Sequence, residues 1–135
     1  MIVLDSSFLV AFHNERDALH AKALEAMDRF LNGTWGRGLL LEYVFLEVVT
    51  VLMVRRDVSV ASRVGGLLLD AAELELVPCS DIFQKTVKAF GAQKDTRLSF
   101  TDTAIAVVAK ARAEGRILTF DEEFRKLSAV RVYPE

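Results

Sequence analysis

Four acidic residues stand at positions where carboxylates can do chemistry instead of only solvating a surface. Asp5 and Asp121 each come close after a short apolar run, Glu47 lies inside the apolar stretch 43–54, and Asp102 opens a helical pattern. If the strands before Asp5 and Asp121 are neighbours in a parallel sheet, the two carboxylates reach the same crevice. Carboxylates gathered in one crevice repel each other, and a hard divalent cation relieves that repulsion.

Each acid also has an ordinary structural interpretation. An Asp after a strand, such as Asp5 or Asp121, is a common helix N-cap. Ser99 to Asp102 has the pattern of a capping box, although an acid in a first helical turn can face a ligand as well. Glu47 is harder to explain, because the stretch around it predicts a mostly buried helix and an unpaired buried carboxylate is costly. The ordinary structural explanations for Glu47 are a salt bridge to another element or a place on a polar stripe that faces water.

Glu42 competes with Glu47 for the role of the acid on this helix. The two are five positions apart, roughly 140° around a helix, so they do not share a face. We prefer Glu47 because it lies deeper in the apolar stretch, and we expect Glu42 to sit at the strand-to-helix junction.

The ligand types favour Mg²⁺ or Mn²⁺, which prefer oxygen donors. Zinc is disfavoured, because His13, His20 and Cys79 are the only His and Cys residues and have no paired spacing. One or two such ions can activate water, orient a phosphodiester and stabilise the leaving oxygen.

The elements that must position these acids alternate along the chain. The patterns predict strands at 2–4, 39–41, 74–77, 117–119 and 130–132, and helices beginning near Phe8 and covering 17–31, 43–56, 59–73, 81–92, 99–113 and 121–127. Gly65 and Gly66 are expected to allow close packing of their helix, and Gly115 to end the helix before it. Alternation of this kind predicts an α/β fold with a mostly parallel sheet covered on both faces.

Composition bounds the class of protein. The chain has 135 residues, of which 52% are hydrophobic, and a formal net charge of −2. We expect one domain over residues 1–135 with a continuous core, and some apolar surface to be covered by a partner or a second copy. With no secretory signal, no stretch long enough to span a bilayer and a single cysteine, we expect a cytoplasmic protein without a membrane partner.

The ordered acids and their surroundings resemble the PIN-domain family, and within it the VapC-type toxin ribonucleases of toxin–antitoxin pairs. The matching pieces span nearly the whole chain and are the segments 2–7, 43–48, 98–102 and 117–124. The resemblance implies a three-layer α/β/α fold with a five-stranded sheet in the order 3-2-1-4-5. It implies a catalytic and metal-binding site at Asp5, Glu47, Asp102 and Asp121, supported by the hydroxyls of Ser6, Ser7 and Thr119. Glu122 and Glu123 stand beside Asp121 and are alternative acids for its place.

The resemblance implies a divalent-metal-dependent endoribonuclease whose products carry a 5′-phosphate and a 3′-hydroxyl. It also implies a VapB-like antitoxin and a homodimer as partners. Because the net charge is slightly negative, RNA must be held by the metal and by local cations. The possible phosphate contacts are Arg16, Arg55, Arg56, Lys94, Arg97, Arg116 and Arg125, each of which is also explained as ordinary surface.

Two other functions fit parts of the sequence. A PIN-like module that binds RNA or protein without catalysis would keep the fold, although all four acids are present. A phosphatase with Asp5 as its nucleophile usually has a second Asp two residues later, where this chain has Ser7.

Overall fold

A central sheet of five parallel strands organises the chain in the computed structural model, which describes all 135 residues. The strands are β1 (Ile2–Leu4), β2 (Gly38–Leu41), β3 (Leu74–Val77), β4 (Arg116–Leu118) and β5 (Arg131–Tyr133). Their order is β3-β2-β1-β4-β5, and every neighbouring pair is parallel. The predicted order and α/β/α class are therefore confirmed.

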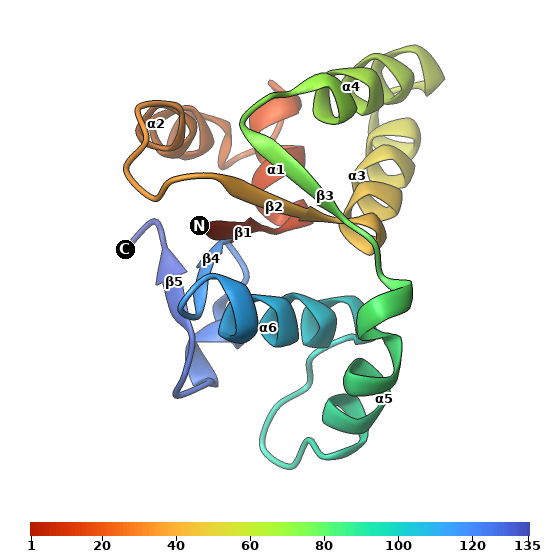
Figure 1. The fold of residues 1–135 in the computed structure, drawn as a ribbon. Helices are drawn as coiled ribbons and strands as arrows, with labels where there is room; N and C mark the ends of the chain where they lie inside the picture. Colours follow the sequence, from red (N-terminus) through yellow and green to blue (C-terminus); the bar gives the residue numbers. More distant parts are fainter.

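The helices cover both faces of this sheet (Figure 1). The connections on one side of β1 contain α1 (Ser6–His13), α2 (His20–Leu31), α3 (Glu42–Arg55) and α4 (Val58–Asp70). The long connection from β3 back to β4 contains the 3₁₀ helix η1 (Ser80–Ile82), α5 (Phe83–Gly91) and α6 (Phe100–Arg112). The chain thus winds outward from β1 to β3 and then crosses over to β4, so right-handed crossovers place the two helix groups on opposite faces.

The reversal of strand order between β1 and β4 fixes where a ligand can bind. In β1 and β2 every residue is buried, as expected for central parallel strands that are covered on both faces. Val3 is paired with Ile117 and Leu4 with Leu118, so β1 and β4 end side by side. Side chains that directly follow these two strands therefore meet at the carboxyl edge of the sheet.

Several predicted boundaries differ from the observed ones for local reasons. Helix α2 begins at His20 and not at Asp17, because Asp17 forms a turn in which its carboxylate accepts a hydrogen bond from the amide of Leu19 at 2.9 Å. Helix α4 ends at Asp70 instead of Glu73. The last predicted helix is the 3₁₀ helix η2 (Glu122–Lys126). No helix has the length and apolar character needed to cross a membrane.

Of the three glycines with predicted roles, Gly65 and Gly115 have those roles and Gly66 does not. A Cβ at Gly65 would lie 3.3 Å from side-chain atoms of Phe45 and Val49, so this residue does allow α3 and α4 to pack closely. Gly66 faces open space. Gly115 has φ +79° and donates to the carbonyl of Ala109 at 2.8 Å, which completes the turn that ends α6.

Candidate active site

Asp5 occupies the turn between β1 and α1, but it does not act as an ordinary helix cap. It has the N-cap backbone position of α1, yet its side chain makes no capping hydrogen bond. The residue is 2% exposed. Its Oδ2 atom accepts hydrogen bonds from the hydroxyls of Ser7 at 2.8 Å and Thr119 at 2.7 Å. The carboxylate is therefore held by side chains from α1 and from the end of β4.

The electrostatic setting of Asp5 disfavours its charged form. Burial raises the pKa of the Asp5 carboxyl above its ordinary value, the hydroxyls of Thr119 and Ser7 partly offset that rise, and the nearby Asp121 adds to it. The two hydroxyls are themselves fixed, because Ser7 Oγ accepts from the amide of Phe120 at 3.0 Å and Thr119 Oγ1 from the amide of Asp121 at 2.9 Å. A buried carboxylate that is preorganised in this way is suited to a cation ligand.

Glu47 approaches from α3. Ser6 Oγ donates to its Oε1 atom at 2.9 Å and lies 3.5 Å from Asp5 Oδ1, so Ser6 links the two acids. Burial raises the pKa of the Glu47 carboxyl, and the charge of Asp5 raises it further. Glu42, its competitor, instead accepts a hydrogen bond from the amide of Cys79 at 2.7 Å. Glu42 thus ties the start of α3 to the chain after β3.

The expectation that α3 is mostly buried was wrong. Only Val44, Val48 and Leu52 of this helix are buried, whereas Leu46, Met53 and Val54 are exposed. The apolar residues of α3 are distributed around nearly its whole circumference, so the sequence did not reveal which face of the helix would pack against the core. Glu47 is half-buried at the edge of the covered face.

Asp102 combines the two roles that the sequence left open. Its amide donates to Ser99 Oγ at 3.0 Å and its Oδ2 accepts from the Ser99 amide at 3.2 Å, which forms the predicted capping box of α6. Burial raises the pKa of the Asp102 carboxyl to about 6, with a further contribution from the charge of Asp5. The side chain also faces the crevice that contains the other acids.

Asp121 precedes η2, and its acidic neighbours point elsewhere. Its Oδ1 atom accepts a hydrogen bond from the amide of Glu123 at 3.0 Å. Glu122 pairs with Arg125 at 2.7 Å, and Glu123 pairs with Lys126. These exposed ion pairs leave Asp121 as the one acid of its segment that lines the crevice.

All four predicted acids line one crevice of about 370 Å³ at the carboxyl edge of the sheet, together with Ser6, Ser7 and Ser99. The donor set fits a hard cation, because it consists of oxygen atoms. Burial and mutual repulsion both disfavour the charged forms of Asp5 and Asp102, and a bound cation would offset both effects. No three of them are spaced to hold one ion directly. Mg²⁺ commonly binds one or two carboxylates and keeps several waters, so the remaining acids would act through water.

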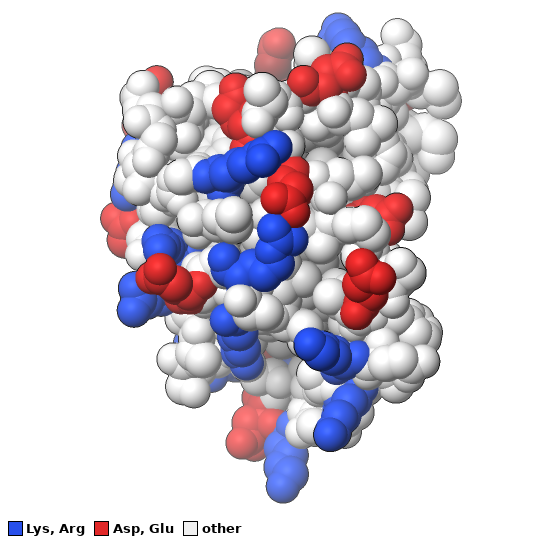
Figure 2. Space-filling model, in the orientation of Figure 1, with Lys and Arg blue, Asp and Glu red and all other residues white.

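Among the cations considered as RNA contacts, Arg55 is the one that lines this crevice. Arg16, Lys94 and Arg97 are exposed outside it. Arg116 begins β4 and pairs with Glu114 at 3.0 Å, which places it at the opposite edge of the sheet. On the face shown in Figure 2, basic side chains are interspersed with acidic ones.

The remaining two cations considered lie outside the crevice as well. Arg56 donates to Asn14 at 3.3 Å, and Arg125 pairs with Glu122.

Sequence reasoning missed the far end of the crevice. Asp17 lines it, as do Val10, Leu19 and Val51. The loop between α1 and α2 carries Asp17 and Leu19 to the crevice, and no periodic pattern marks such a loop. The recurrence of Glu47, Val51 and Arg55 at four-residue intervals was the available signal, because it places these three side chains on one helix face.

Comparison with known proteins is consistent with this architecture. The crystal structure of VapC20 from Mycobacterium tuberculosis, a toxin that cleaves the sarcin–ricin loop, superposes with a TM-score of 0.84 and 21% sequence identity over 99% of this chain and 100% of that one. No curated protein matches the sequence significantly. The sequence model of the PIN domain matches residues 2–130, and the chain therefore belongs to the PIN-domain family.

Proposed function

We propose that this protein is a divalent-metal-dependent endoribonuclease of the VapC type, the toxin of a toxin–antitoxin pair. The observation that carries the proposal is the convergence of Asp5, Glu47, Asp102 and Asp121 from four separate segments on one crevice. Burial of Asp5 with two hydroxyl donors is a second support, because a stability role alone would favour an apolar residue at such a position.

The proposed chemistry assigns different tasks to the side chains. Asp5, Glu47, Asp102 and Asp121 would hold Mg²⁺ or Mn²⁺, directly or through water. When bound, such an ion supplies Lewis acidity and a water of lowered pKa for attack on a phosphodiester. Ser7 and Thr119 fix Asp5 through its Oδ2 atom, and Ser6 holds Glu47. These hydroxyls are thus proposed to position the carboxylates and not to react themselves.

Attack by water predicts products with a 5′-phosphate and a 3′-hydroxyl. Cleavage through the 2′-hydroxyl of RNA would instead need acid–base groups of the histidine type, and no histidine lines the crevice. His13 lies elsewhere, and burial lowers its pKa to about 4, with the nearby Arg63 contributing. It is therefore neutral at physiological pH and outside the reacting region.

The test is cleavage of end-labelled RNA during a titration with Mg²⁺ or Mn²⁺, with EDTA as a control and the product ends mapped. We expect cleavage that stops with EDTA and is lost in Asp5→Asn and in Asp102→Asn, while both variants stay folded by circular dichroism. Cleavage that survives in both variants would refute the metal site. RNA binding without cleavage would favour the non-catalytic module, and a phospho-enzyme trapped at Asp5 would favour the phosphatase.

We propose RNA as the substrate class, and the particular RNA is assigned by comparing substrates. VapC20 cleaves the sarcin–ricin loop, so a synthetic hairpin of that loop belongs among the tested RNAs, beside tRNA and unstructured RNA. Preference for one of these, measured as kcat/KM, assigns the substrate.

Partners are proposed from the apolar surface. Leu46, Met53 and Val54 of α3 and Leu67 and Leu69 of α4 are exposed, and exposed apolar patches of this kind mark interaction surfaces. We propose a homodimer and a small VapB-like antitoxin as their occupants, in a cytoplasmic protein. Light scattering of the purified chain tests the dimer, and co-purification with the product of an adjacent short gene, with loss of RNA cleavage in the complex, tests the antitoxin.

A further inference from the structure

The crevice extends well beyond the four acids. Along α3 it is lined by Glu47, Val51 and Arg55, which follow one another at intervals of four residues. Each interval advances about 6 Å along a helix, so Arg55 lies about 12 Å from Glu47 along the axis. The crevice is thus a groove with the four acids at one end and the Arg55–Asp17 ion pair at the other.

The middle of the groove is apolar. Val51 of α3 lies between Glu47 and Arg55, Val10 follows Ser6 by one turn of α1, and Leu19 lies beside Asp17 toward the Arg55 end. Val10 is almost fully buried, and Val51 and Leu19 are half-buried. A flat apolar group that lies between two anionic groups would match the proposed metal site, the apolar side chains and an Arg55 released from Asp17.

Arg55 is placed to exchange its partner. Its guanidinium lies 3.7 Å from Asp17 Oδ2, and its side chain is 57% exposed. Asp17 itself is fixed, because its other oxygen accepts from the amide of Leu19 at 2.9 Å. An ion pair at such a distance that involves an exposed arginine is weak, so a phosphate arriving in the groove can replace Asp17 as the partner of Arg55.

We propose that this groove is a subsite for one single-stranded RNA segment beside the cleaved phosphodiester, an inference that rests on the proposed function. Val10, Leu19 and Val51 contact a nucleobase that is splayed out of any duplex. Arg55 binds a neighbouring phosphate and not the one that is cleaved, because it lies about two helical turns from Glu47. Asp17 holds Arg55 at the mouth of the groove until RNA arrives.

The size of the groove favours a nucleotide over a duplex. Its volume of about 370 Å³ lies at the small end of ligand pockets, and proteins read RNA mainly where bases are unstacked and reachable. A peptide with an apolar and an acidic side chain is the other occupant that this chemistry could accept. An RNA cleavage assay distinguishes these two occupants. Substitutions in the groove change KM for RNA only if the groove binds RNA and not a peptide.

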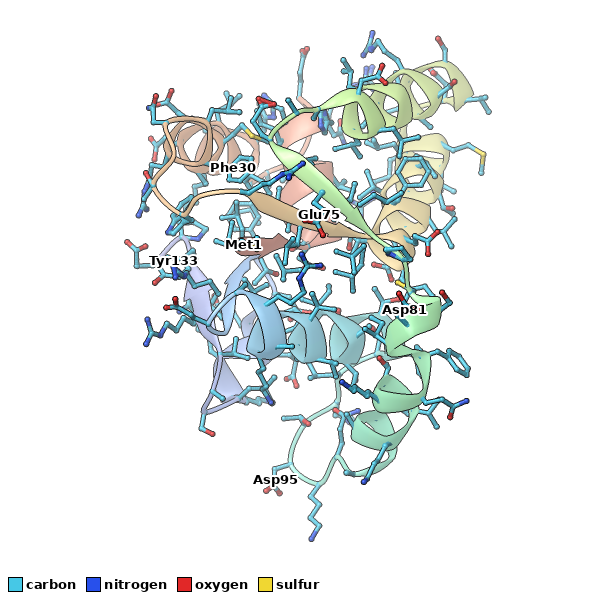
Figure 3. All side chains as sticks on the ribbon, viewed as in Figure 1. Met1, Phe30, Glu75, Asp81, Asp95 and Tyr133 are labelled. Carbon is cyan, nitrogen blue, oxygen red and sulfur yellow. The ribbon has the colours of Figure 1, made fainter.

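The experiment compares steady-state cleavage of single-stranded RNA by wild type, Arg55→Ala, Arg55→Lys, Asp17→Asn and Val51→Thr across a range of salt concentrations. Arg112→Ala is the matched control, because Arg112 also pairs with an acid, Glu75, and lies at the far end of α6. Figure 3 shows Glu75 on β3. Asp17→Asn keeps the turn, since an amide oxygen can accept from Leu19 as the carboxylate does.

We expect Arg55→Ala to raise KM about tenfold with less than a twofold change in kcat. The slope of log(kcat/KM) against log salt should become less negative by about 0.7, the value for one phosphate contact to a single strand. Arg55→Lys should keep the wild-type slope, and Asp17→Asn should lower KM. Val51→Thr should raise KM severalfold without any change in the slope, and Arg112→Ala should match wild type.

Shortening the RNA adds an internal check. Once the RNA is too short to reach Arg55, wild type and Arg55→Ala should have the same KM. An unchanged KM and salt slope in Arg55→Ala, or an equal effect of Arg112→Ala, would overturn the subsite while leaving the nuclease activity in place. If wild type cleaves no RNA, the proposed function fails, and the same variants measured by fluorescence anisotropy of RNA binding still decide whether the groove holds RNA.

Discussion

Asp102→Asn should make the protein more stable without metal and less responsive to metal. The substitution keeps the shape of the side chain, and its amide oxygen can still accept from the Ser99 amide in the capping box. What it removes is the charge of a carboxyl whose pKa is raised to about 6 by burial and by Asp5. Removing that charge should relieve the cluster.

The size of this effect follows from linkage. The rise of the Asp102 pKa from 3.8 to about 6 corresponds to about 3 kcal/mol, at about 1.4 kcal/mol for each pKa unit. Because Asp102 is only partly buried, solvent screening reduces this to about 1.5 kcal/mol. For a chain of this length that is about 5 °C in Tm.

The sign depends on pH in a defined way. The pKa of Asp102 is higher in the folded protein than in the unfolded chain. The stability that the wild type gains from a protonated Asp102 is therefore fully present below pH 3.8 and is lost as the pH rises through about 6. The variant has no such loss. The two proteins should therefore be equally stable near pH 4 and differ most above pH 7, with EDTA present throughout.

The assay is urea denaturation of both proteins from pH 4 to 8, in EDTA and in Mg²⁺. At about 100 times its Kd, Mg²⁺ should stabilise wild type by about 2.7 kcal/mol and the variant by clearly less, so the order of stability reverses. Asp95→Asn is the matched control, because Asp95 is exposed in the loop between α5 and α6 (Figure 3). A variant that is no more stable than wild type in EDTA at pH 7.5, or a difference that does not change with pH, would refute the reasoning.

Four further predictions concern other positions. Thr119→Val should weaken Mn²⁺ binding about tenfold or more, because it removes the hydroxyl that donates to Asp5 at 2.7 Å. Thr119→Ser should restore most of the affinity, measured by titrating each protein with Mn²⁺. Equal Mn²⁺ affinities of wild type and Thr119→Val would refute this. Ser6→Ala should lower kcat several-fold at saturating Mg²⁺, because it removes a 2.9 Å hydrogen bond to the α3 carboxylate, while Tm changes little; a large fall in Tm would indicate a structural role instead. Gly115→Ala should cost about 3 kcal/mol or more in urea denaturation, because φ is +79° and the new Cβ would lie 2.1 Å from a backbone oxygen. Gly66→Ala, with open space around its Cβ, should instead stabilise α4 by about 0.5 to 1 kcal/mol.

The sequence was most informative where local pattern and topology coincide. Asp5 directly follows β1, and Asp121 follows β4 after two residues, so knowing that these strands are neighbours brings both acids to one edge. That neighbourhood came from the resemblance to PIN domains, since the strand patterns alone leave the order open. The capping box of Ser99 and Asp102 was readable directly, because it depends only on adjacent residues.

Features set by packing between distant segments were not readable. Helix α3 is apolar around most of its circumference, and its packing against α1, α4 and β2 decides which of its apolar side chains are buried, such as Val48, and which are exposed, such as Leu46 and Val54. The position of Arg116 was within reach of prediction. A residue at the start of a parallel strand lies at the opposite edge from the carboxyl ends, where the acids gather.

Asp5 shows why a common local motif can conceal a candidate functional residue. Its backbone has the N-cap conformation that an Asp after a strand would predict, so the local pattern was correct about the position and silent about the side chain. The side chain leaves the cap unused and turns to Ser7 and Thr119, although Thr119 is 114 residues away in sequence. A carboxylate that leaves the helix cap unused, accepts from one nearby and one distant hydroxyl and stays buried beside other acids is what the proposed cation site requires of Asp5.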